Sequence, residues 1–417
     1  MCQVRGAESG RRREKFGVRG AMKSQEMIRV TLHKGRERRP LAGHPWIYQG
    51  EIQRIEGDPA PGELVEVCDA RGRFVGRGYI NLRSQIAVRL LTWQDEAIDG
   101  LFLRRRIQAA IDLRKRWVAD AEAYRVVFGE ADLLPGLIVD RYGEVLVVQF
   151  LTAGMEALSG ALLNPLVDLL QPRGIYARND APARELEGLE RTSGFLRGQV
   201  DTLLQISEGG VRFWVDIASG QKTGWFLDQR ENRLRLRSFA ERREVLDAFC
   251  YTGGFGVHAA AAGARSVVGI ELSKEAAALA MRNAELNGLG EIVRIVEGNA
   301  FDELRSMDRE RRQFDLVVLD PPAFTKGKEA LESAIRGYKE INLRAMKLLR
   351  EGGILITCSC SYHLPVELFR EMLVEAAADA HRRFRVIELR TQAQDHPILL
   401  HVRETHYLKC AILEAIS

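Results

Sequence analysis

The stretch ILITCSCSY at residues 354–362 carries two thiols, Cys358 and Cys360, at the end of an apolar run. A C-x-C pair without a second Cys/His pair at suitable spacing does not suit a metal ion, and a redox pair needs the spacing C-x-x-C. Cys358 lies within the run and is expected to be a small buried side chain. Cys360 stands at the end of the run, where a thiol can meet a ligand and act as a nucleophile.

The elements that must position Cys360 belong to the part of the chain after about Arg212. Five apolar, β-rich runs occur there, separated mostly by helical stretches, and each ends in small or polar residues. Such strands alternating with helices indicate a parallel sheet covered on both faces. Ligands bind beyond the carboxyl ends of these strands, so we expect the chemistry where each run stops. The runs are VLDAFCYTG, SVVGIELS, IVRIVEGNA, FDLVVLDPP and GGILITCSC.

Four of these runs end in residues that suit a nucleotide-type ligand. Gly253 ends the first run and Gly254 follows it, and their lack of a Cβ atom lets a ligand approach the backbone. Glu271 ends the second run, where an acid can hold ribose hydroxyls. Asn299 ends the third run and Asp320 the fourth. Because the fingerprint G-x-G-x-x-G is absent, pyrophosphate binding is poorly supported and a nicotinamide dehydrogenase is disfavoured.

The motifs D-x-F-x-x-T-G-G-F, G-I-E-x-S, G-N-A-F and L-D-P-P, in this order, resemble those of class I S-adenosylmethionine (SAM)-dependent methyltransferases. The resemblance implies a Rossmann-like α/β domain with SAM as cofactor. It places Asp247 to Gly253 at the methionine moiety, Glu271 at the ribose, and Asn299 with Ala300 beside the adenine. The family usually has aspartate where this chain has Asn299. The other contacts implied at the cofactor are Ala248, Phe249, Cys250, Thr252, Leu272, Ser273 and Asp320.

A longer match lies upstream, in QKTGWFLDQREN at residues 221–232. It resembles the signature Q-K-T-G-x-[FY]-L-D-Q-R-x-N of the ribosomal RNA large subunit methyltransferase I family, whose members carry an N-terminal PUA domain. The resemblance extends over most of residues 27–417. It implies that this segment folds over the cofactor, with Lys222, Thr223 and Asp228 as contacts. From the residues alone, the segment is typical of a helix start with polar first turns.

The motif at Asp320 leaves two target atoms open. D-P-P resembles the site with which many relatives methylate an exocyclic amine, using a backbone carbonyl and the acid as acceptors. Carbon 5 of a pyrimidine instead needs a nucleophile added to carbon 6, and a thiolate suits this because it also leaves again. In the resembling family the S-C-S cysteine, here Cys360, is that nucleophile. Asp320 is then expected to hydrogen-bond N3 and the amino group of cytosine. The better-known RNA cytosine-5 methyltransferases carry a second cysteine in the motif D-A-P-C-S. This chain has Ala323 after D-P-P and therefore lacks that thiol.

The first half of the chain shows no motif for chemistry. Residues 28–92 alternate apolar and polar positions between turns, which is typical of a small antiparallel β domain. Basic and aromatic residues interleave over residues 32–52 and suit an RNA backbone with stacked bases, although a solvated surface with one buried Trp46 gives the same pattern. The resemblance identifies this domain as PUA-like. Residues 101–118 predict an amphipathic helix, and strands and a helix over 155–170 follow.

Composition limits the remaining choices. The 417 residues fit two or three domains, and no apolar run is long enough to cross a bilayer. Six irregularly spaced cysteines favour a reducing cytoplasm. A net charge of +4 permits a nucleic-acid partner without demanding one. His396, in the sequence Asp-His-Pro, is expected to be a turn histidine, with a contact to substrate as the alternative.

The sequence thus predicts a mainly α/β chain of four segments: a disordered tail at 1–26, a PUA-like RNA-binding domain at 27–95, an α+β connector at 96–200 and a Rossmann-like methyltransferase domain at 201–417. We expect transfer of a methyl group from SAM to carbon 5 of a cytosine in ribosomal RNA. We expect no metal and no membrane, and a cytoplasmic monomer or homodimer. One alternative is an amine N-methyltransferase acting through Asp320-Pro321-Pro322. Another is a non-catalytic, cofactor-bound ribosome assembly factor.

Overall fold

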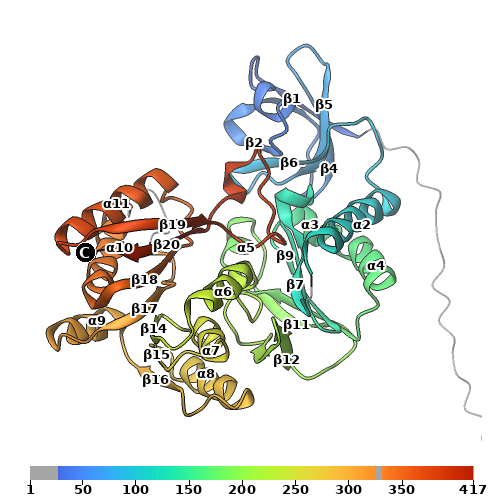
Figure 1. The fold of residues 1–417 in the computed structure, drawn as a ribbon. Helices are drawn as coiled ribbons and strands as arrows, with labels where there is room; N and C mark the ends of the chain where they lie inside the picture. Colours follow the sequence, from blue (N-terminus) through green and yellow to red (C-terminus); the bar gives the residue numbers. More distant parts are fainter. Residues whose placement is uncertain (1–26, 120, 325–330, 417) are drawn as a thin grey trace, which may run out of the picture.

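The computed structural model describes residues 27–119, 121–324 and 331–416, so the predicted tail and Cys2 lie outside the described residues. Within these ranges the chain forms four β-sheets, of six, five, two and seven strands. In Figure 1 the six-stranded sheet (blue) stands above the five-stranded sheet (teal to green), and the seven-stranded sheet (yellow to red) lies beside them. The sheets follow one another along the chain, and the domain boundaries at 95 and 200 stay predictions.

The first sheet has the strand order β2-β6-β5-β4-β1-β3. Its strands are β1 (Ile28–Leu32), β2 (Trp46–Tyr48), β3 (Ile52–Glu56), β4 (Leu64–Cys68), β5 (Phe74–Ile80) and β6 (Ile86–Thr92). Alternate residues such as Val30, Leu32, Val65 and Val67 are buried in one core, as the period of two predicts. The expectation of an antiparallel sheet is wrong at one pair, since β1 runs parallel to β4. The helix α1 (Arg38–Leu41), β2 and β3 lie between these two strands and provide the long connection that a parallel pair needs.

The second sheet has the order β11-β10-β9-β8-β7 and packs with helices on a core of its own. Its strands are β7 (Ala123–Phe128), β8 (Leu137–Tyr142), β9 (Val145–Phe150), β10 (Gly174–Asn179) and β11 (Thr192–Arg197). The helix predicted at 101–118 is confirmed as α2 (Gly100–Trp117), which Asp99 caps by accepting a hydrogen bond from the N–H of Phe102. The helix predicted at 155–170 is two helices, α3 (Ala153–Ala157) and α4 (Ser159–Leu170). A short helix, α5 (Ala183–Leu186), follows β10.

A hairpin of β12 (Leu203–Glu208) and β13 (Val211–Asp216) leads into the Q-K-T-G segment. Gly209 and Gly210 form its two-residue turn with φ of 56° and 80°, backbone angles that residues other than glycine rarely adopt. The helix start predicted in DQREN is present, as the 3-10 turn η3 (Leu227–Gln229) followed by α6 (Arg230–Leu236). Gln229 stands at the N-cap without making a capping hydrogen bond, so its side chain is available elsewhere.

The seven-stranded sheet has the order β16-β15-β14-β17-β18-β20-β19. Its strands are β14 (Glu244–Ala248), β15 (Ser266–Glu271), β16 (Val293–Glu297), β17 (Phe314–Leu319), β18 (Leu349–Ser359), β19 (Phe384–Arg390) and β20 (Lys409–Ala415). The five apolar runs form the five parallel strands, as predicted. β20 then returns antiparallel to both β18 and β19. The strand order reverses at β14, which has β15 on one side and β17 on the other, so a ligand crevice is expected beyond these strand ends.

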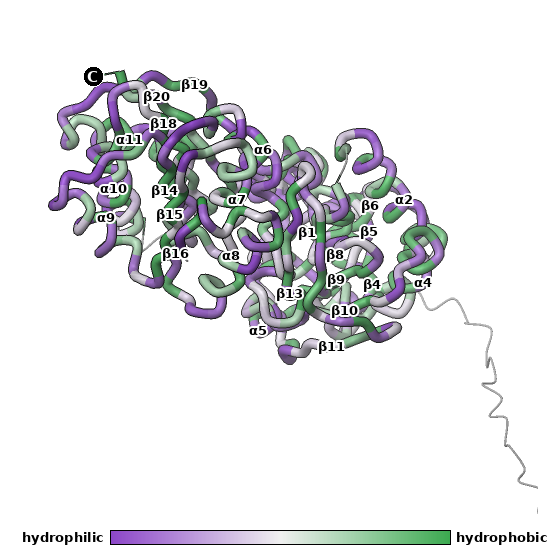
Figure 2. Tube along the Cα trace, turned by 60° about the horizontal axis from the view of Figure 1, so that its bottom comes forward, coloured by the Kyte–Doolittle hydropathy of each residue, from purple (hydrophilic) through white to green (hydrophobic). Residues whose placement is uncertain are grey.

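Helices cover both faces of this sheet: α7 (Gly254–Ala261), α8 (Lys274–Leu286), α9 (Ala300–Arg309), α10 (Leu331–Leu348) and α11 (Val366–Asp379). Val257 of α7 packs with Val245 and Val267 in one core, while Tyr338 of α10 packs with Leu246 in a second. Figure 2 shows the strands of the sheet as a mainly hydrophobic trace inside a more hydrophilic exterior. None of the helices in the described residues is both long and apolar enough to cross a membrane.

Candidate active site

The turn at residues 249–253, directly after β14, has a strained backbone. Phe249 and Tyr251 have φ of 65° and 50°, and Gly253, the N-cap of α7, has φ of 83°. A non-glycine residue in this conformation costs of order 1 kcal/mol or more, and such residues cluster at ligand sites. Between them Cys250 is buried and its N–H donates to the carbonyl of Ile270, so the turn is fixed against β15. The implied contact of Cys250 with the cofactor stays a prediction.

Two buried polar atoms around this turn lack a partner among the described residues. Asp247, near the end of β14, accepts from the N–H of Gly256 at 2.8 Å through Oδ2, while its Oδ1 is unpaired. Burial, with the nearby charges of Asp320 and Glu271, raises the pKa of Asp247 to about 8. Thr252 is also buried, and its Oγ1 is unpaired. Buried polar groups almost always find a partner, so these atoms indicate a polar ligand at the end of β14.

Glu271 joins the ends of β14 and β15. Its carboxylate accepts from the N–H of Tyr251 at 2.9 Å and from the N–H of Ser273 at 2.8 Å. Each oxygen keeps a further lone pair, which can accept from the hydroxyls of a ribose. Ser273 caps α8 by accepting from the N–H of Ala276, and Leu272 is 70% exposed beside it. The acid is therefore held by the turn that directly follows β14 and Asp247.

The third strand end contributes Asn299 and Ala300. Asn299 is the N-cap of α9, and its side-chain oxygen accepts from the N–H of Phe301 at 2.9 Å. This use of the oxygen was not foreseen from the sequence, although Asn is a common N-cap residue. Ala300 is buried, and the ring of Phe301 lies edge-on to Phe249 with centroids 6.2 Å apart. The first and third strand ends therefore meet through these two aromatic rings.

Lys222 and Asp228 form an ion pair on the other side of the strand ends. The Nζ of Lys222 lies 2.6 Å from Oδ2 of Asp228, and the hydroxyl of Tyr407 donates to the same oxygen at 2.6 Å. Burial raises the pKa of Asp228, but the charges of Lys222 and His396, with these hydrogen bonds, lower it well below its usual range. Oδ1 of Asp228 is buried and unpaired within the described residues, so it can accept a hydrogen bond from a ligand.

Thr223, the neighbour of Lys222, makes its contacts with the second sheet. Its hydroxyl donates to Asp140 of β8 at 2.6 Å and lies 2.9 Å from the hydroxyl of Tyr142. Its side chain therefore ties the Q-K-T-G segment to β8. The predicted contact between Thr223 and the cofactor stays a prediction.

Asp320 and Cys360 lie together at the ends of β17 and β18. The amide of Gln229 donates to Oδ1 of Asp320 at 2.8 Å, and burial, with the charge of Asp228, raises the pKa of Asp320 to about 6. The Sγ atom of Cys360 lies 3.9 Å from the carbonyl oxygen of Pro321. Burial raises the pKa of Cys360 to about 11, with Lys222 acting against this shift. The carboxyl group of Asp320, which can be protonated near pH 6, and the thiol of Cys360 thus lie at one site.

The side chains of Cys358, Cys410 and His396 are buried in the core. Cys358 is fully buried on β18 opposite Cys410 of β20, which confirms the expectation of a buried side chain. His396 lies in a turn, as expected, and its Nδ1 is 2.9 Å from Oδ1 of Asp395. Its ring is buried against Phe128, with centroids 5.2 Å apart. This burial disfavours the alternative of a substrate contact for His396.

Several functional candidates were missed by the sequence reasoning. Gln229 lies within the quoted signature, but it was taken only as part of a helix start. Tyr407 and Lys409 come from THYLK, which carries no motif, and they reach the site because β20 pairs with β18. Among the described residues, no three His, Cys, Asp or Glu side chains are grouped to hold a metal ion.

The surface of the first sheet carries basic side chains. Arg39 lies 4.8 Å from the ring centre of Tyr48 and pairs with Glu51 at 2.7 Å, so these interleaved residues partly bind one another. The expectation of a buried Trp46 is wrong, because Trp46 is only partly buried, and its indole N–H donates to Glu130 at 2.9 Å. Within residues 32–52, the cations that stay exposed with no carboxylate partner among the described residues are Lys34, Arg36 and Arg38.

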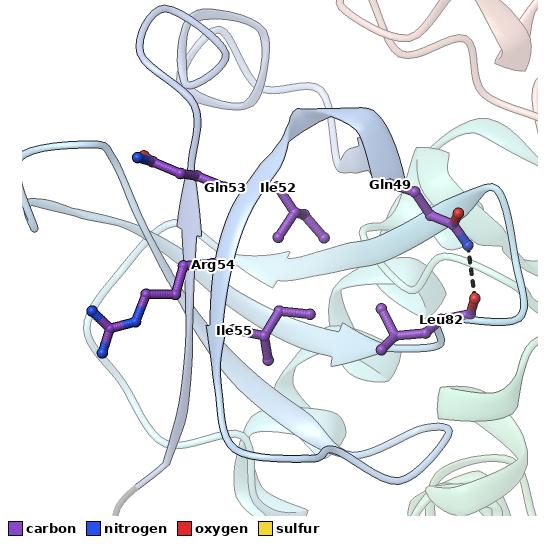
Figure 3. A pocket seen from close by; sticks show the side chains of 6 residues that line it. All are labelled: Gln49, Ile52, Gln53, Arg54, Ile55 and Leu82. Atoms are coloured by element: carbon purple, nitrogen blue, oxygen red, sulfur yellow. Dashed lines mark hydrogen bonds between the residues drawn. The ribbon is translucent and has the colours of Figure 1, made fainter.

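A shallow groove of about 410 Å³ lies along the edge strand β3 of the same sheet. Figure 3 shows three apolar side chains of the groove facing one another, while its arginine points away. A glutamine amide donates across one end to a backbone carbonyl at 2.7 Å. The groove is lined by Gln49, Ile52, Gln53, Arg54, Ile55 and Leu82.

Comparison with known proteins gives the family. The PUA-like domain family matches residues 30–93, and the S-adenosylmethionine-dependent methyltransferase family matches residues 189–398. The proteins named ribosomal RNA large subunit methyltransferase I from Erwinia tasmaniensis and Yersinia pseudotuberculosis are each 42% identical over 388 residues, which cover 92% of this chain and 98% of theirs. A Streptococcus mutans structure described as a SAM-dependent methyltransferase has a TM-score of 0.79 at 21% identity, over 93% of this chain and 100% of that one.

These comparisons give the cofactor. The unpaired polar atoms of Asp247 and Thr252 and the carboxylate of Glu271 fit SAM, whose amino acid and ribose carry groups that bind such atoms. The order of strands around β14 is also that of a Rossmann-like sheet with its crevice at the switch point. This chain is a SAM-dependent methyltransferase with an N-terminal PUA-like domain, and it belongs to the ribosomal RNA large subunit methyltransferase I family.

Proposed function

We propose that this protein methylates carbon 5 of a cytosine in large-subunit ribosomal RNA, and that the thiolate of Cys360 adds to carbon 6 during the reaction. The names of the Erwinia and Yersinia relatives support the class of RNA. The observation that carries the target atom is the partial exposure of one thiol. Among the described cysteines Cys360 alone is not buried, and it lies beside Asp320-Pro321 at the strand ends.

The residues of the site suit each step of this chemistry. The thiolate of Cys360 forms a bond to carbon 6, and Asp320, protonated below about pH 6, donates a hydrogen bond to N3, where negative charge develops. The electron pair at carbon 5 is then free to take up a methyl group. Loss of the proton at carbon 5 and cleavage of the C6–S bond restore the ring double bond and return the thiolate of Cys360.

The cofactor is held by the turn after β14. Asp247, Thr252 and Glu271 are the residues whose oxygens are available to it, and the rings of Phe249 and Phe301 stand beside the adenine end. SAM supplies an electrophilic methyl group. The charges of Lys222 and Asp228 act on both Asp320 and Cys360, so we assign this ion pair to the substrate side of the site.

Amine methylation through Asp320-Pro321-Pro322 remains the alternative reaction. In the motif for such reactions an aromatic residue follows D-P-P directly, whereas this chain has the exposed Ala323 there. The next residue, Phe324, packs against Tyr338 with ring centroids 4.5 Å apart. The nearest aromatic side chain after D-P-P is therefore packed in the core and does not take the place of the aromatic residue in the amine motif. This favours the thiol reaction.

The PUA-like domain is proposed to bind the RNA backbone. Its exposed cations Lys34, Arg36 and Arg38 can contact phosphates. The target base must leave its stack, or be presented in a single strand, because carbon 6 is reached from above the ring. A cytoplasmic location fits the free state of the described cysteines, and a monomer or homodimer stays our prediction for the assembly.

The test uses protein-free large-subunit RNA and labelled SAM, followed by digestion to nucleosides and chromatography. Wild type is expected to give labelled 5-methylcytosine, Cys360→Ala none, and the control Cys68→Ala, which removes a thiol from the first sheet, an amount like wild type. RNA containing 5-fluorocytosine is expected to trap a covalent adduct with wild type only, because fluorine cannot leave as the proton does.

Other results would point to the alternatives. A labelled amine product, or full activity of Cys360→Ala, would overturn the thiol mechanism. Binding of SAM without transfer to free RNA or to assembled particles would instead support a non-catalytic assembly factor.

A further inference from the structure

Lys409 is a buried cation beside the Cys360 turn. It is the first residue of β20, pairs in register with Ser359 of β18, and is only 5% exposed. Its Nζ donates to the carbonyl oxygen of Ser361 at 2.6 Å and to that of Tyr407 at 2.9 Å. No carboxylate among the described residues lies within ion-pair distance of it. Burying an ammonium group with only neutral acceptors is costly, so a reason for the charge is needed.

The turn that carries Cys360 is held from two sides. The hydroxyl of Ser361 lies 2.8 Å from that of Tyr338 on α10, and its N–H donates to Oγ of Ser359 at 3.3 Å. Lys409 holds the carbonyl of Ser361 from the side of β20. The residue directly after the thiol is therefore fixed by contacts with α10, β18 and β20.

The charges around the thiol also give Lys409 a particular place. Asp320 and Asp228 disfavour a thiolate at Cys360, whereas Lys222 and Lys409 favour it. Lys222 is already paired with Asp228 at 2.6 Å, so much of its charge is offset. Burial lowers the pKa of Lys409 to about 8, and the thiol of Cys360 acts against this shift.

We infer that Lys409 is a positioning residue for Cys360, which fixes the Ser361 carbonyl and supplies the positive charge that stabilises the thiolate. This inference rests on the proposed role of Cys360 as the nucleophile. It adds a residue of β20 to the site and gives its buried ammonium a function. The pKa of the thiol, about 11 with Lys409 present, would lie higher without this charge, and less thiolate would form.

The test measures thiolate formation directly, without RNA or SAM. The rate at which iodoacetamide alkylates Cys360 is followed between about pH 7 and pH 10 by mass spectrometry of the Cys360 peptide, because only the thiolate reacts. Below about pH 8, where Lys409 carries its charge, Lys409→Met is expected to react about tenfold more slowly than wild type, which corresponds to about one pKa unit, and the difference should shrink above that pH. Lys409→Arg keeps the charge and is expected to stay within about threefold of wild type. The control Lys115→Met removes an exposed lysine of α2 and is expected to match wild type.

A folded Lys409→Met variant that is alkylated as fast as wild type would overturn the inference. If that variant does not fold, the wild-type protein decides, through the rates with anionic iodoacetate and neutral iodoacetamide. A nearby cation favours the anionic reagent, so a rate ratio that falls as the pH rises through about 8, where Lys409 loses its proton, supports the inference, and a constant ratio overturns it.

The outcome is separate from that of the proposed function. If Cys360→Ala still made methylated RNA, the thiol mechanism would fail while the effect of Lys409 on alkylation could stand. If Lys409→Met lost methyl transfer but kept the wild-type alkylation profile, the role assigned to Lys409 would fail and the thiol mechanism would not.

Discussion

The side-chain amide of Gln229 donates to Asp320 at 2.8 Å, which joins the start of α6 to the end of β17. The oxygen of the same amide accepts from Asn232 at 2.7 Å, so the orientation of Gln229 is fixed. Asp320 therefore has one oxygen held by the protein and one available to a base. The Q-R-x-N part of the signature thus orients the acid of the D-P-P motif.

Replacing Gln229 by Met should impair methyl transfer more than cofactor binding. The variant removes the hydrogen bond that orients Asp320 and leaves the turn after β14 unchanged. We expect kcat/KM for RNA to fall about tenfold, the usual scale of one hydrogen bond to a charged group. Calorimetric titration with SAM should give wild-type affinity, and a similar loss in both measurements would contradict the prediction.

The rate should rise with pH up to about 6 and then stay level. Below this pH Asp320 is already protonated, so further acid only protonates the thiolate of Cys360. Above it, loss of the proton from Asp320 offsets the gain of thiolate, until the pKa of Cys360 at about 11. Since the hydrogen bond from Gln229 lowers the pKa of Asp320, the level part should begin at higher pH in Gln229→Met. The pH dependence of kcat/KM measures both limits.

SAM should bind more tightly as the pH rises through about 8. Burial keeps Asp247 protonated below this pH in the free protein, and a cationic ligand favours its ionised form. Binding near pH 7 should therefore release a proton, which calorimetry in buffers of different ionisation enthalpy detects. Asp247→Asn should bind SAM about tenfold more weakly and lose this proton release. A proton release equal to that of wild type would exclude Asp247 as its source.

Removal of the exposed cations Lys34, Arg36 and Arg38 should weaken RNA binding in a salt-dependent way. The triple Ala variant is expected to bind less tightly at low salt and to show a smaller slope of log K against log salt, because fewer counterions are released. SAM affinity should not change. An equal salt slope for variant and wild type would place the RNA backbone elsewhere.

Asp395 should be important for folding. Its carboxylate accepts from Arg230 at 2.9 Å and from the N–H of Arg125 at 2.9 Å, beside His396. Asp395→Ala leaves buried Arg230 with only its longer ion pair, to Glu231 at 3.6 Å, so we expect a loss of about 3–5 kcal/mol in the free energy of unfolding by denaturant. A loss below about 1 kcal/mol would show that the arginine finds another partner or water.

The carboxylate of Asp395 should also contribute to the pH dependence of unfolding in acid. Burial raises the pKa of Asp395, but His396 and Arg230 lower it well below its usual range. The stabilisation is therefore complete above the ordinary aspartate pKa of about 4, and it is lost as the pH falls below that value toward the lowered one. Unfolding midpoints measured against pH should fall less steeply in Asp395→Ala.

The sequence predicted the strand ends well because a buried parallel strand needs an unbroken apolar run. Asp247, Glu271 and Asp320 each end such a run, and the structure collects them at one edge of the sheet. The direction of β20 was not predictable, since an apolar run looks alike in parallel and antiparallel strands. Tyr407 and Lys409 enter the site only through that pairing.

Other contacts of the site were not predicted because the two partners are distant in the sequence. The hydroxyl of Thr223 binds Asp140, which lies on another sheet 83 positions away, and no local pattern marks such a contact. Asn299 uses its side chain as a helix cap, a role that its position before α9 allowed one to predict.

The contacts of Asp395 also limit how this protein could be rebuilt. Arg114 and Arg125, from the connector, hold the backbone carbonyl and a side-chain oxygen of Asp395 in the segment that leads to β20. The catalytic half is therefore not an exchangeable module, because its last strand is anchored to its neighbour. A fusion that moved the methyltransferase part to a different RNA-binding domain would have to carry the connector with it.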